Sequence, residues 1–387
     1  MLSKGGESYS FEYDKEWLKK TGLKLTLDPE LMPYSGRQYP SGKNIFGLFA
    51  GASPDRWGRV LMNKRERILA DKEGRKPSKL YDSDYLLGVC DQTRMGGIRF
   101  KLDPDGPFLS DDKETAAPPW AKLRTLEEAS RPKATVVDTK GQLWIAKFPS
   151  RNDENDTGAW EMVVHDLAAL CGLNVPEAKL EKFSSLGSTY LVKRFDRVLD
   201  KRVHFASAMT LLGKTDGASA ADGTSYLDIV SFIKSYGAQP KKDFRELWKR
   251  IVFNMAVTNT DDHLRNHAFV LAEHGWILSP LYDVNPVPYG DELSLNVDEE
   301  NNSISIDLAI QTAVRFEISE EDAKNCAEDI RKIVRENWER TAADYGLTRR
   351  QIEEMRPAFS ACCAGISSGT AGRRHAGRHV LVLCLSF

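Results

Sequence analysis

The 387-residue sequence lacks the features that mark membrane, secreted and metal-binding proteins. No apolar run reaches the length of about 20 residues that a transmembrane helix needs. The first residues carry charge, but they contain neither an apolar stretch nor the small-residue cleavage site of a secretory signal. The six cysteines show no CxxC pairing and no metal-ligand spacing. These absences predict a cytoplasmic protein with reduced cysteines and no membrane association.

The sequence also lacks an excess of charge of either sign. Its 54 Lys and Arg residues nearly balance 56 Asp and Glu residues, and the formal net charge is −2. Bulk charge therefore does not favour binding to nucleic acid or anionic membranes, and any nucleic-acid contact must be local or supplied by a partner. A hydrophobic content of 41% with 28% charged residues is ordinary for a globular protein, and the length corresponds to two or three domains.

Composition and periodicity divide the chain into five segments. A small α+β unit with one helical stretch, Asp55 to Leu69, comes first, and a linker rich in Asp, Pro, Lys and Glu follows it. A β-rich segment, a mostly helical segment and an atypical tail complete the chain. The predicted segments are residues 1–110, 111–133, 134–197, 198–357 and 358–387.

The β-rich segment begins with a predicted hairpin. Residues 134–138 and 143–148 are rich in strand-forming residues, and a turn that contains glycine separates them. The period of two places Lys147 on one face of the second strand beside apolar neighbours. An amphipathic helix follows and is expected to carry Glu161 in its first turn.

Residues 259–284 contain the pattern of a phosphoryl-transfer site. Asp261 and Asn266 have the D-x-x-x-x-N spacing of the kinase catalytic loop, where the aspartate receives the hydroxyl proton and the asparagine ligates metal. Asp283 follows one predicted hairpin later, where a kinase places its second metal-binding carboxylate. Oxygen ligands of this kind suit Mg²⁺.

Lys147 and Glu161 extend this pattern upstream, because a kinase lysine contacts the phosphates and a helix carboxylate holds it. Each residue also has a simpler interpretation. Lys147 fits a solvated strand lysine, Glu161 an acid favoured by the helix dipole, and Asp283 a turn former. The order Lys, Glu, Asp, Asn, Asp, interleaved with the expected strand, helix and hairpin, favours a protein-kinase-like core.

A zinc site is an alternative interpretation of the catalytic-loop region. His263 and His267 stand four residues apart, a spacing that serves zinc when both lie on a helix. The segment has the pattern of a loop that passes into a strand, and it contains no HExxH. Hydrogen-bonded structural histidines are therefore the favoured interpretation.

Four separated motifs together resemble the HipA-type toxin kinases. The family pattern is close to TD-x-H-x-K/R-N followed by P-x-Y-D, and this chain has TDDHLRN at 260–266 and SPLYDV at 279–284. LWIAKFP at 143–149 and KRFDR at 193–197 also match. The segments 54–59 and 91–97 look like the small N-terminal subdomain of the family, and the likeness covers roughly residues 40–357.

The resemblance implies an α+β, two-lobed protein-kinase-like fold with a β-rich N-lobe and a mostly helical C-lobe. It implies a serine/threonine kinase of a bacterial toxin–antitoxin system that uses ATP and Mg²⁺ and phosphorylates itself. The residues carried over are Asp261 as catalytic base with His263 beside it, Asn266 and Asp283 on Mg²⁺, and Lys147, Glu161, Lys193, Phe195 and Arg265 at the nucleotide.

The resemblance also implies partners. Members of the family act on translation components, typically aminoacyl-tRNA synthetases. A HipB-like helix-turn-helix antitoxin neutralises them and carries the complex to operator DNA. The near-neutral charge of this chain fits a DNA contact made mainly through the antitoxin.

Two departures from the family pattern keep alternatives open. Residues 121–140 contain no glycine, so the Gly-rich loop that cradles phosphates is missing, either because the chain is a degenerate kinase or because that stretch is absent from this chain. The tail from Ala361 to Phe387 is Gly-, Ser- and Arg-rich, which favours a frameshift or added extension over a nucleic-acid-binding tail. The alternatives to a toxin kinase are a non-catalytic scaffold that binds antitoxin and operator DNA, or a small-molecule kinase.

Overall fold

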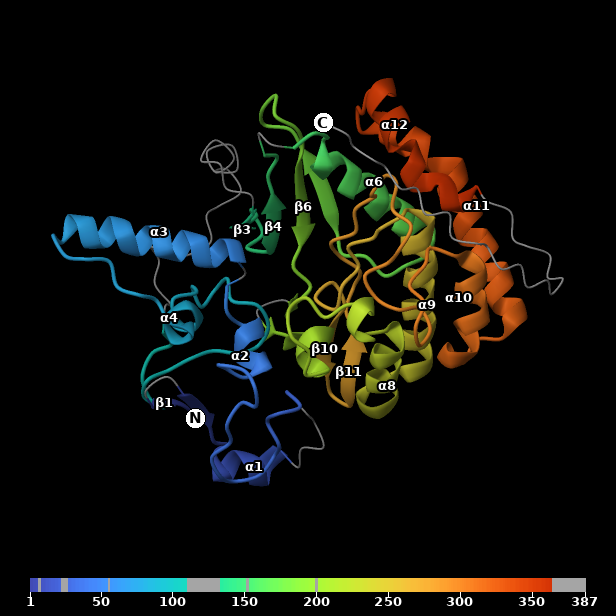
Figure 1. Cartoon of the computed structure of the whole chain (residues 1–387). Coiled ribbons are helices and arrows are strands. Elements are labelled where there is room, and N and C mark those ends of the chain that lie inside the picture. Colours follow the sequence, from blue (N-terminus) through green and yellow to red (C-terminus); the bar gives the residue numbers. More distant parts are fainter. Residues whose placement is uncertain are drawn as a thin grey trace, which may run out of the picture.

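The computed structural model describes residues 1–5, 8–21, 27–54, 56–109, 133–150, 153–198 and 201–363. They form an N-terminal subdomain beside a body of two lobes (Figure 1). The predicted linker, the possible helix at 121–130, and the tail beyond Cys363 lie outside these residues. Within the described part of the chain, no helix is long and apolar enough to cross a membrane.

The N-terminal subdomain has its own small core. Its elements are β1 (Leu2–Gly5), β2 (Ser8–Phe11), α1 (Lys15–Thr21), α2 (Gly47–Gly51), α3 (Arg56–Lys72) and α4 (Asp82–Leu87), and β1 and β2 pair antiparallel. The buried side chains that α2, α4 and β2 share include Tyr9, Phe46, Phe49 and Leu86. The helix expected at 55–69 is confirmed, and it continues to Lys72.

The first lobe is a four-stranded antiparallel sheet in the order β3-β4-β6-β5. The strands are β3 (Lys133–Val137), β4 (Leu143–Lys147), β5 (Ala178–Glu181) and β6 (Thr189–Lys193), and β3 and β4 form the expected hairpin. Helix α6 (Thr157–Leu170) packs against β5 and β6. Figure 1 shows α6 beside the sheet and facing the second lobe.

Helix α6 begins at Thr157, directly after its cap residue Asp156. Asp156 caps it, because one carboxylate oxygen accepts the backbone N–H of Ala159 at 3.1 Å. Glu161 is the fifth residue of α6, so it lies in the second turn, one position beyond the first turn where it was expected. At this position Glu161 is buried, which argues against a role as a solvated dipole-stabilising acid.

Two short sheets connect the lobes. A ribbon of β7 (Arg197–Val198) and β8 (Lys201–Arg202) follows the first lobe directly. A three-stranded antiparallel sheet then combines β9 (Phe205–Ser207), β10 (Ala268–Ala272) and β11 (Gly275–Leu278). The hairpin expected at 268–278 is confirmed, and it separates the loop that holds Asp261 from the loop that holds Asp283.

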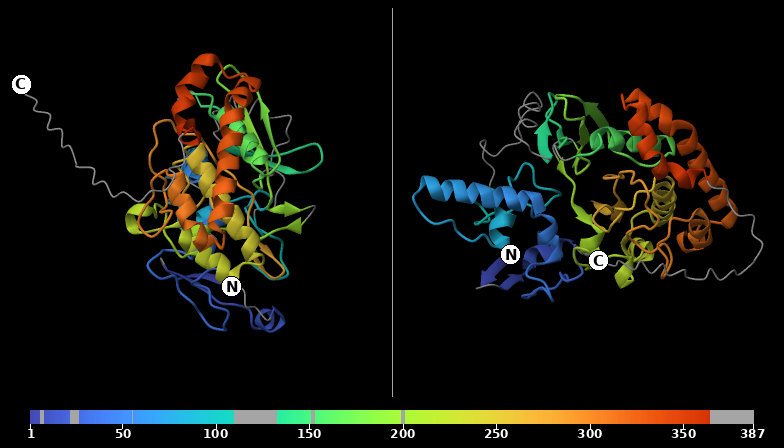
Figure 2. Two further views of the ribbon diagram at one scale, coloured as in Figure 1. Left: turned by 90° about the vertical axis from the view of Figure 1, so that its right-hand side faces the viewer. Right: turned by 45° about the horizontal axis from the view of Figure 1, so that its top comes forward.

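The second lobe is helical and surrounds α9. Its elements are α7 (Ala208–Leu211), η2 (Ala220–Asp222), α8 (Tyr226–Tyr236), α9 (Pro240–Ala256), α10 (Ile306–Thr312), η3 (Ala313–Phe316), α11 (Glu320–Asp344), α12 (Arg349–Met355) and η4 (Arg356–Cys362). The apolar face predicted for 244–256 is buried along its whole length. Helix α11 packs on both α6 and α9, so the two lobes share one core (Figure 2).

The helical lobe extends past residue 357, where the tail was expected to begin. Phe359 in η4 is buried, and its ring stacks on Trp338 with centroids 4.3 Å apart. Cys362 is also buried. Residues 358–363 therefore belong to the lobe, because the buried side chains of Ala358, Phe359 and Cys362 complete its core against α9 and α11.

Candidate functional site

Lys147 stands at the end of β4 and contacts two carboxylates. Its Nζ lies 2.5 Å from Glu161 Oε1 and 2.6 Å from Asp283 Oδ1. The sheet register places Lys147 opposite Tyr190, on the face of the sheet that α6 covers. Three segments far apart in the sequence thus meet at one ammonium group, in the order that the sequence predicted.

Lys147, Glu161 and Asp283, here called the triad, shift one another's pKa values. Burial lowers the pKa of the Lys147 ammonium, but attraction to Glu161 and Asp283 outweighs burial and raises that pKa. Burial also raises the pKa of Asp283, but the positive charge of Lys147 overcomes it and lowers the pKa to about 2. Burial raises the pKa of Glu161, and the ammonium only partly offsets this rise. Two carboxylates on one ammonium leave a site that attracts a further cation.

The backbone at Asp283 adopts a conformation that costs energy. Its φ is 58°, in the left-handed region that residues other than glycine seldom occupy. Such a conformation costs on the order of 1–3 kcal/mol and persists only where the surroundings hold it. The ion pair with Lys147 is one such restraint, and it directs the carboxylate toward Glu161 and β4.

The catalytic-loop residues lie just after α9. The chain reverses at Thr258, a buried residue with φ of 50°, and then exposes the Asp261 side chain to solvent at 79%. Asn266 is buried and donates from Nδ2 to the backbone oxygen of Asp261 at 2.8 Å. His263 Nε2 lies 3.8 Å from Asp261 Oδ1. The loop is therefore held rigid while its first carboxylate remains accessible.

The neighbouring Asp262 has a structural role that sequence reasoning missed. It is buried and accepts hydrogen bonds from Tyr226 Oη at 2.6 Å and from the His267 ring at 2.9 Å. Burial raises the pKa of Asp262, but His267 and Tyr226 outweigh burial and lower it. His267 thus serves as a structural histidine, as expected, and it does not converge with His263 on a metal. Among the described residues, no three His, Cys, Asp or Glu side chains form a metal-binding group.

The chemistry of Asn266 and Asp283 nevertheless fits Mg²⁺. Both offer hard oxygen donors, and the Nδ2 bond of Asn266 leaves its amide oxygen as the free acceptor. Mg²⁺ usually takes one or two protein ligands and completes its shell with water and substrate phosphates. Two protein ligands are therefore sufficient for a nucleotide-bound metal.

The remaining predicted residues divide into those near the triad and those away from it. Phe195 packs against Tyr282, the residue before Asp283, with ring centroids 5.8 Å apart. Arg265 pairs with exposed Asp216 at 3.1 Å, and its backbone oxygen accepts the Tyr282 hydroxyl at 2.7 Å. The Arg265 side chain thus lies at the surface, and only its backbone contacts a neighbour of Asp283.

Lys193 lies on β6 with its side chain on the other face of the sheet from Lys147. It pairs in register with Trp144, while Lys147 pairs with Tyr190 three residues away. Its Nζ forms an ion pair with Glu177 at 3.2 Å. The structure does not bring the Lys193 side chain to the triad, so any contact of Lys193 with a nucleotide there must use its backbone.

A buried ionic cluster directly after Phe195 joins the lobes to the N-terminal subdomain. Asp196 is fully buried and accepts bonds from the Arg194 guanidinium at 2.7 and 2.9 Å and from Arg197 at 2.8 Å. It also accepts the backbone N–H of Gly96 at 2.7 Å. Arg194 and Arg197 both donate to the backbone oxygen of Arg94. The sequence analysis placed Lys193 and Phe195 of this motif at the nucleotide, and it did not foresee the contact of Arg194, Asp196 and Arg197 across about 100 residues.

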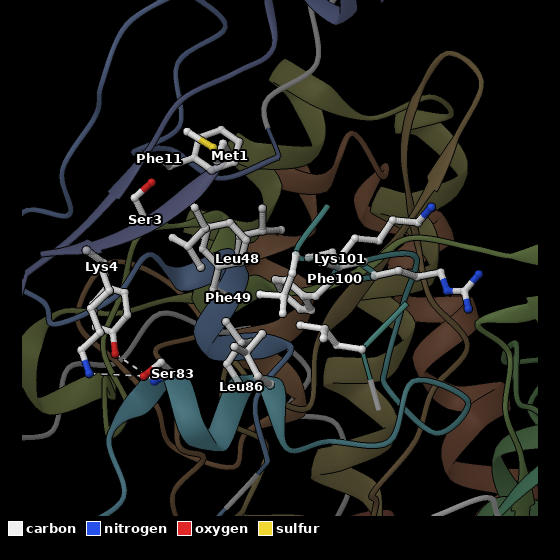
Figure 3. A pocket seen from close by; sticks show the side chains of 17 residues that line it. Met1, Ser3, Lys4, Phe11, Leu48, Phe49, Ser83, Leu86, Phe100 and Lys101 are labelled. Carbon is white, nitrogen blue, oxygen red and sulfur yellow. Dashed lines mark hydrogen bonds between the residues drawn. The ribbon is translucent and has the colours of Figure 1, made fainter. Parts of the chain in front are cut away.

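A separate apolar pocket of about 440 Å³ lies within the N-terminal subdomain. Leu48, Phe49, Leu86 and Phe100 line it, and Lys4 at its edge bonds to Ser83 Oγ at 3.4 Å (Figure 3). None of the predicted catalytic or nucleotide-binding residues lines this pocket. It is therefore distinct from the Lys147 site.

Two family models and several curated proteins match this chain. The family model of the HipA-like C-terminal domain matches residues 129–338, and the HipA N-terminal domain matches residues 1–76. The putative kinase Y4mE of Sinorhizobium fredii is 28% identical over 225 residues, which are 54% of this chain and 46% of that protein. The putative kinase Y4dM of the same organism is 26% identical over 310 residues, 70% of this chain and 73% of that protein. The match thus spans about half the length of the first relative and about three quarters of the second.

A solved structure supports the fold. The HipA chain of the Shewanella oneidensis MR-1 toxin–antitoxin complex with HipB and operator DNA superposes with a TM-score of 0.66, and the match covers 94% of each chain. Sequence identity in this comparison is 14%, so the likeness concerns the fold. The two-lobed arrangement expected from the sequence is confirmed.

Proposed function

Because this chain belongs to the HipA family of toxin kinases, we propose that it transfers the γ-phosphate of ATP to a serine or threonine hydroxyl of a protein. The observation that carries the proposal is the pairing of Lys147 with both Glu161 and Asp283. A kinase needs these three groups together to bind and orient the phosphates. A structural lysine on a strand needs only one partner.

Each residue has a defined task in this proposal. Lys147 binds the phosphates and Glu161 orients its ammonium. Asp283 and Asn266 would hold Mg²⁺, which supplies positive charge against the phosphates when it is bound. Phe195 and the backbone at Lys193 are the proposed contacts of the adenine, and the packing of Phe195 against Tyr282, the residue before Asp283, supports this role for Phe195.

Asp261 is the proposed general base, with His263 beside it. Its exposed carboxylate accepts the proton of the attacking hydroxyl as the new O–P bond forms and the bond from the γ-phosphorus to ADP breaks. The accessible position of Asp261 supports this role, because an acceptor hydroxyl on another protein must reach it. Asp262, which is buried and twice hydrogen-bonded, cannot meet that requirement.

We further propose that this chain acts in the cytoplasm with a HipB-like antitoxin as its partner. Support comes from the Shewanella oneidensis structure, in which HipA is bound to HipB and operator DNA. The proposed substrate class is a translation component such as an aminoacyl-tRNA synthetase, and autophosphorylation is proposed as a second reaction. Both rest on family membership.

A phosphate-transfer assay tests the proposed reaction. The purified full chain should incorporate labelled phosphate from ATP with Mg²⁺, and Asp261→Asn should lower the rate by about 100-fold or more because it removes the base. Asp329→Asn, on the exposed surface of α11, is a matched control and should keep the wild-type rate. Equal labelling by the Asp261 variant would refute the assignment of the base.

The second candidate function is a non-catalytic scaffold, which the absence of glycine from residues 121–140 favours. A scaffold of this kind would retain antitoxin binding without binding nucleotide. Titration of the full chain with ATP at millimolar Mg²⁺ separates the two functions. Saturable ATP binding that Lys147→Met abolishes supports the kinase, and undetectable binding supports the scaffold.

A further inference from the structure

Helix α3 and the segment after it form a projecting basic arm. In Figures 1 and 2, α3 extends from the N-terminal subdomain away from the two lobes. Residues 58–79, here called the α3 arm, contain eight Lys or Arg and three Asp or Glu. The whole chain has a formal charge of −2, whereas the α3 arm alone has a formal charge of +5.

Two of the three acids of the α3 arm share one cation within it. The Arg75 guanidinium pairs with Glu66 at 2.5 Å and with Glu73 at 2.6 Å. Glu66 also accepts the backbone N–H of Ser78 at 2.8 Å, which ties the returning segment to the helix. These bonds leave Asp71 as the remaining acid among a larger set of exposed cations. The exposed cations are Lys64, Arg65, Arg67, Lys72, Lys76 and Lys79.

The cations of the helix share its solvent side. At about 100° per residue, Lys64, Arg65 and Lys72 lie within about 100° of one another around the axis, and Arg67 lies about 60° beyond Lys64. Ala70, on the opposite side, is fully buried. The 17 residues of α3 extend over about 25 Å. The cations from Lys64 to Lys72 form a row about 12 Å long on the solvent side of the helix, with exposed Ile68 and Asp71 among them.

We propose that the α3 arm binds the phosphate backbone of double-stranded DNA. Duplex DNA carries one negative charge per about 1.7 Å of its axis, which complements such a row. Its major groove, about 12 Å wide, admits an α-helix, whereas the major groove of duplex RNA is too narrow. The arm contains none of the proposed catalytic or nucleotide-binding residues, so this contact is independent of kinase chemistry.

This inference changes the expectation drawn from net charge. A chain that is nearly neutral overall can still supply a local DNA contact when its positive charge is concentrated on one projecting element. In a complex with an antitoxin, the toxin chain would then add its own phosphate contacts to those of its partner. Such contacts position the complex without reading the base sequence.

The test measures binding of the full chain, without antitoxin or ATP, to a fluorescent 20-base-pair duplex between 50 and 200 mM salt. The arm variant combines Lys64→Gln, Arg65→Gln, Arg67→Gln and Lys72→Gln. The control variant removes the same charge from exposed positions of α11 and α12, through Lys324→Gln, Lys332→Gln, Arg340→Gln and Arg349→Gln. Circular dichroism and thermal melting establish that both variants fold.

We expect the arm variant to bind at least about tenfold more weakly at 50 mM salt. The slope of log affinity against log salt should become shallower by about 3 to 4, since each lost phosphate contact contributes about 0.9. The control variant should bind like the wild type. Autophosphorylation of the arm variant should also equal that of the wild type, because the Lys147 site is untouched.

Several outcomes would overturn the proposal. One is undetectable binding of the duplex by the wild type at 50 mM salt. Another is an equal loss of affinity for the duplex in the arm and control variants. Binding to anionic phospholipid vesicles or to polyglutamate as tight as binding to DNA would also refute a DNA surface. Because the binding assay contains no ATP, a failed phosphate-transfer assay leaves its result unchanged, and the two proposals fail separately.

Discussion

At the scale of single residues, two carboxylates share the charge of Lys147, and each has a different environment. Glu161, on α6, is buried, while the Asp283 side chain is 35% exposed and has a backbone in the left-handed region. The more exposed carboxylate is the one able to exchange the lysine for a metal ion. In this structure the Lys147 ammonium neutralises Asp283. With Mg²⁺ and phosphate bound, the metal ion would share that role.

The low pKa of Asp283 has a consequence for stability against pH. Its folded-state pKa, about 2, lies below the ordinary value of 3.8, so its ion pair stabilises the fold above pH 4. This contribution is lost as the pH falls from about 4 to about 2. We expect Asp283→Asn to lower the free energy of unfolding by about 1 kcal/mol at pH 7, a value reduced for solvent screening at this part-exposed group.

Urea unfolding of the wild type and Asp283→Asn at pH 7, 5, 3 and 2.5 measures this difference. It should shrink at the two lowest pH values, because the carboxylate of the unfolded wild type, with its ordinary pKa of 3.8, binds a proton there before the folded carboxylate does. Asp329→Asn serves as the control and should show no such pH dependence. A difference between wild type and Asp283→Asn that grows as the pH falls would contradict the ion pair.

The residue scale also shows where prediction from sequence ended. The D-x-x-x-x-N spacing located the catalytic loop, but it could not decide which of Asp261 and Asp262 faces solvent. That choice depends on Tyr226, which lies 36 residues earlier and donates a hydrogen bond to Asp262 inside the lobe. The His267 bond adds to it. A local spacing rule contains no information about a partner from another helix.

At the scale of elements, the start of α6 is hydrogen-bonded to Ser188, the residue directly before β6. Asp156 accepts Ala159 N–H, Ser188 N–H and Ser188 Oγ, so one carboxylate caps the helix and holds the loop before β6. Gly158 allows this approach, because a Cβ there would lie 2.2 Å from the Ser188 oxygen. The position of Glu161 under Lys147 depends on this junction.

Asp156→Ala should therefore loosen the Lys147 site as well as the helix. We expect a loss of about 1–2 kcal/mol in the free energy of unfolding, since a helix cap and two further hydrogen bonds disappear. The matched control is Ser319→Ala, which removes an exposed cap from α11. Chemical denaturation of both variants, with the ATP KM of each, measures the effect. A raised KM in the control alone would contradict a link between the α6 cap and the site.

The ionic cluster at Asp196 makes a second junction, between the N-terminal subdomain and the segment that holds Phe195. Asp196→Asn removes a buried negative charge that faces two guanidinium groups, and such losses typically cost about 3–5 kcal/mol. We expect a lower midpoint of urea unfolding and a raised KM for ATP. Asp329→Asn should change neither quantity. Wild-type stability in the Asp196 variant would show that the junction contributes nothing.

Prediction from sequence succeeded for elements whose pattern is local. The periodicity of 244–256 and the turn at 139–142 gave the central helix and the first hairpin with small errors at the ends. The Asp196 junction was not predicted, because its partners lie 100 residues away in the segment 93–96. The charged residues Arg194, Asp196 and Arg197 of this motif bind the protein itself, a role that a local motif does not indicate.

At the scale of the whole molecule, the lobes share one core, and the N-terminal subdomain has a separate one. The final described residues close the shared core, because Phe359 stacks on Trp338 of α11 and approaches Trp160 of α6. The unusual composition from Ala361 onward had accompanied a predicted boundary at residue 358. Composition detects a change of sequence type, but it does not detect burial.

Phe359→Ala should destabilise the molecule by about 3–5 kcal/mol, which is typical of a buried phenylalanine. Tyr289→Ala, at a side chain that is 84% exposed, is the control and should have little effect. Thermal unfolding of both variants measures the difference. Equal melting temperatures for Phe359→Ala and the wild type would place residues 358–363 outside the lobe.

The most direct measurement is the rate of phosphate transfer from labelled ATP by the full chain and by Lys147→Met. Lys140→Met, at an exposed position in the turn of the same hairpin, is the matched control. If Lys147, Glu161 and Asp283 form a kinase site, Lys147→Met should lose about 100-fold or more of the rate, while Lys140→Met keeps it. Equal rates for Lys147→Met and the wild type would contradict the kinase assignment.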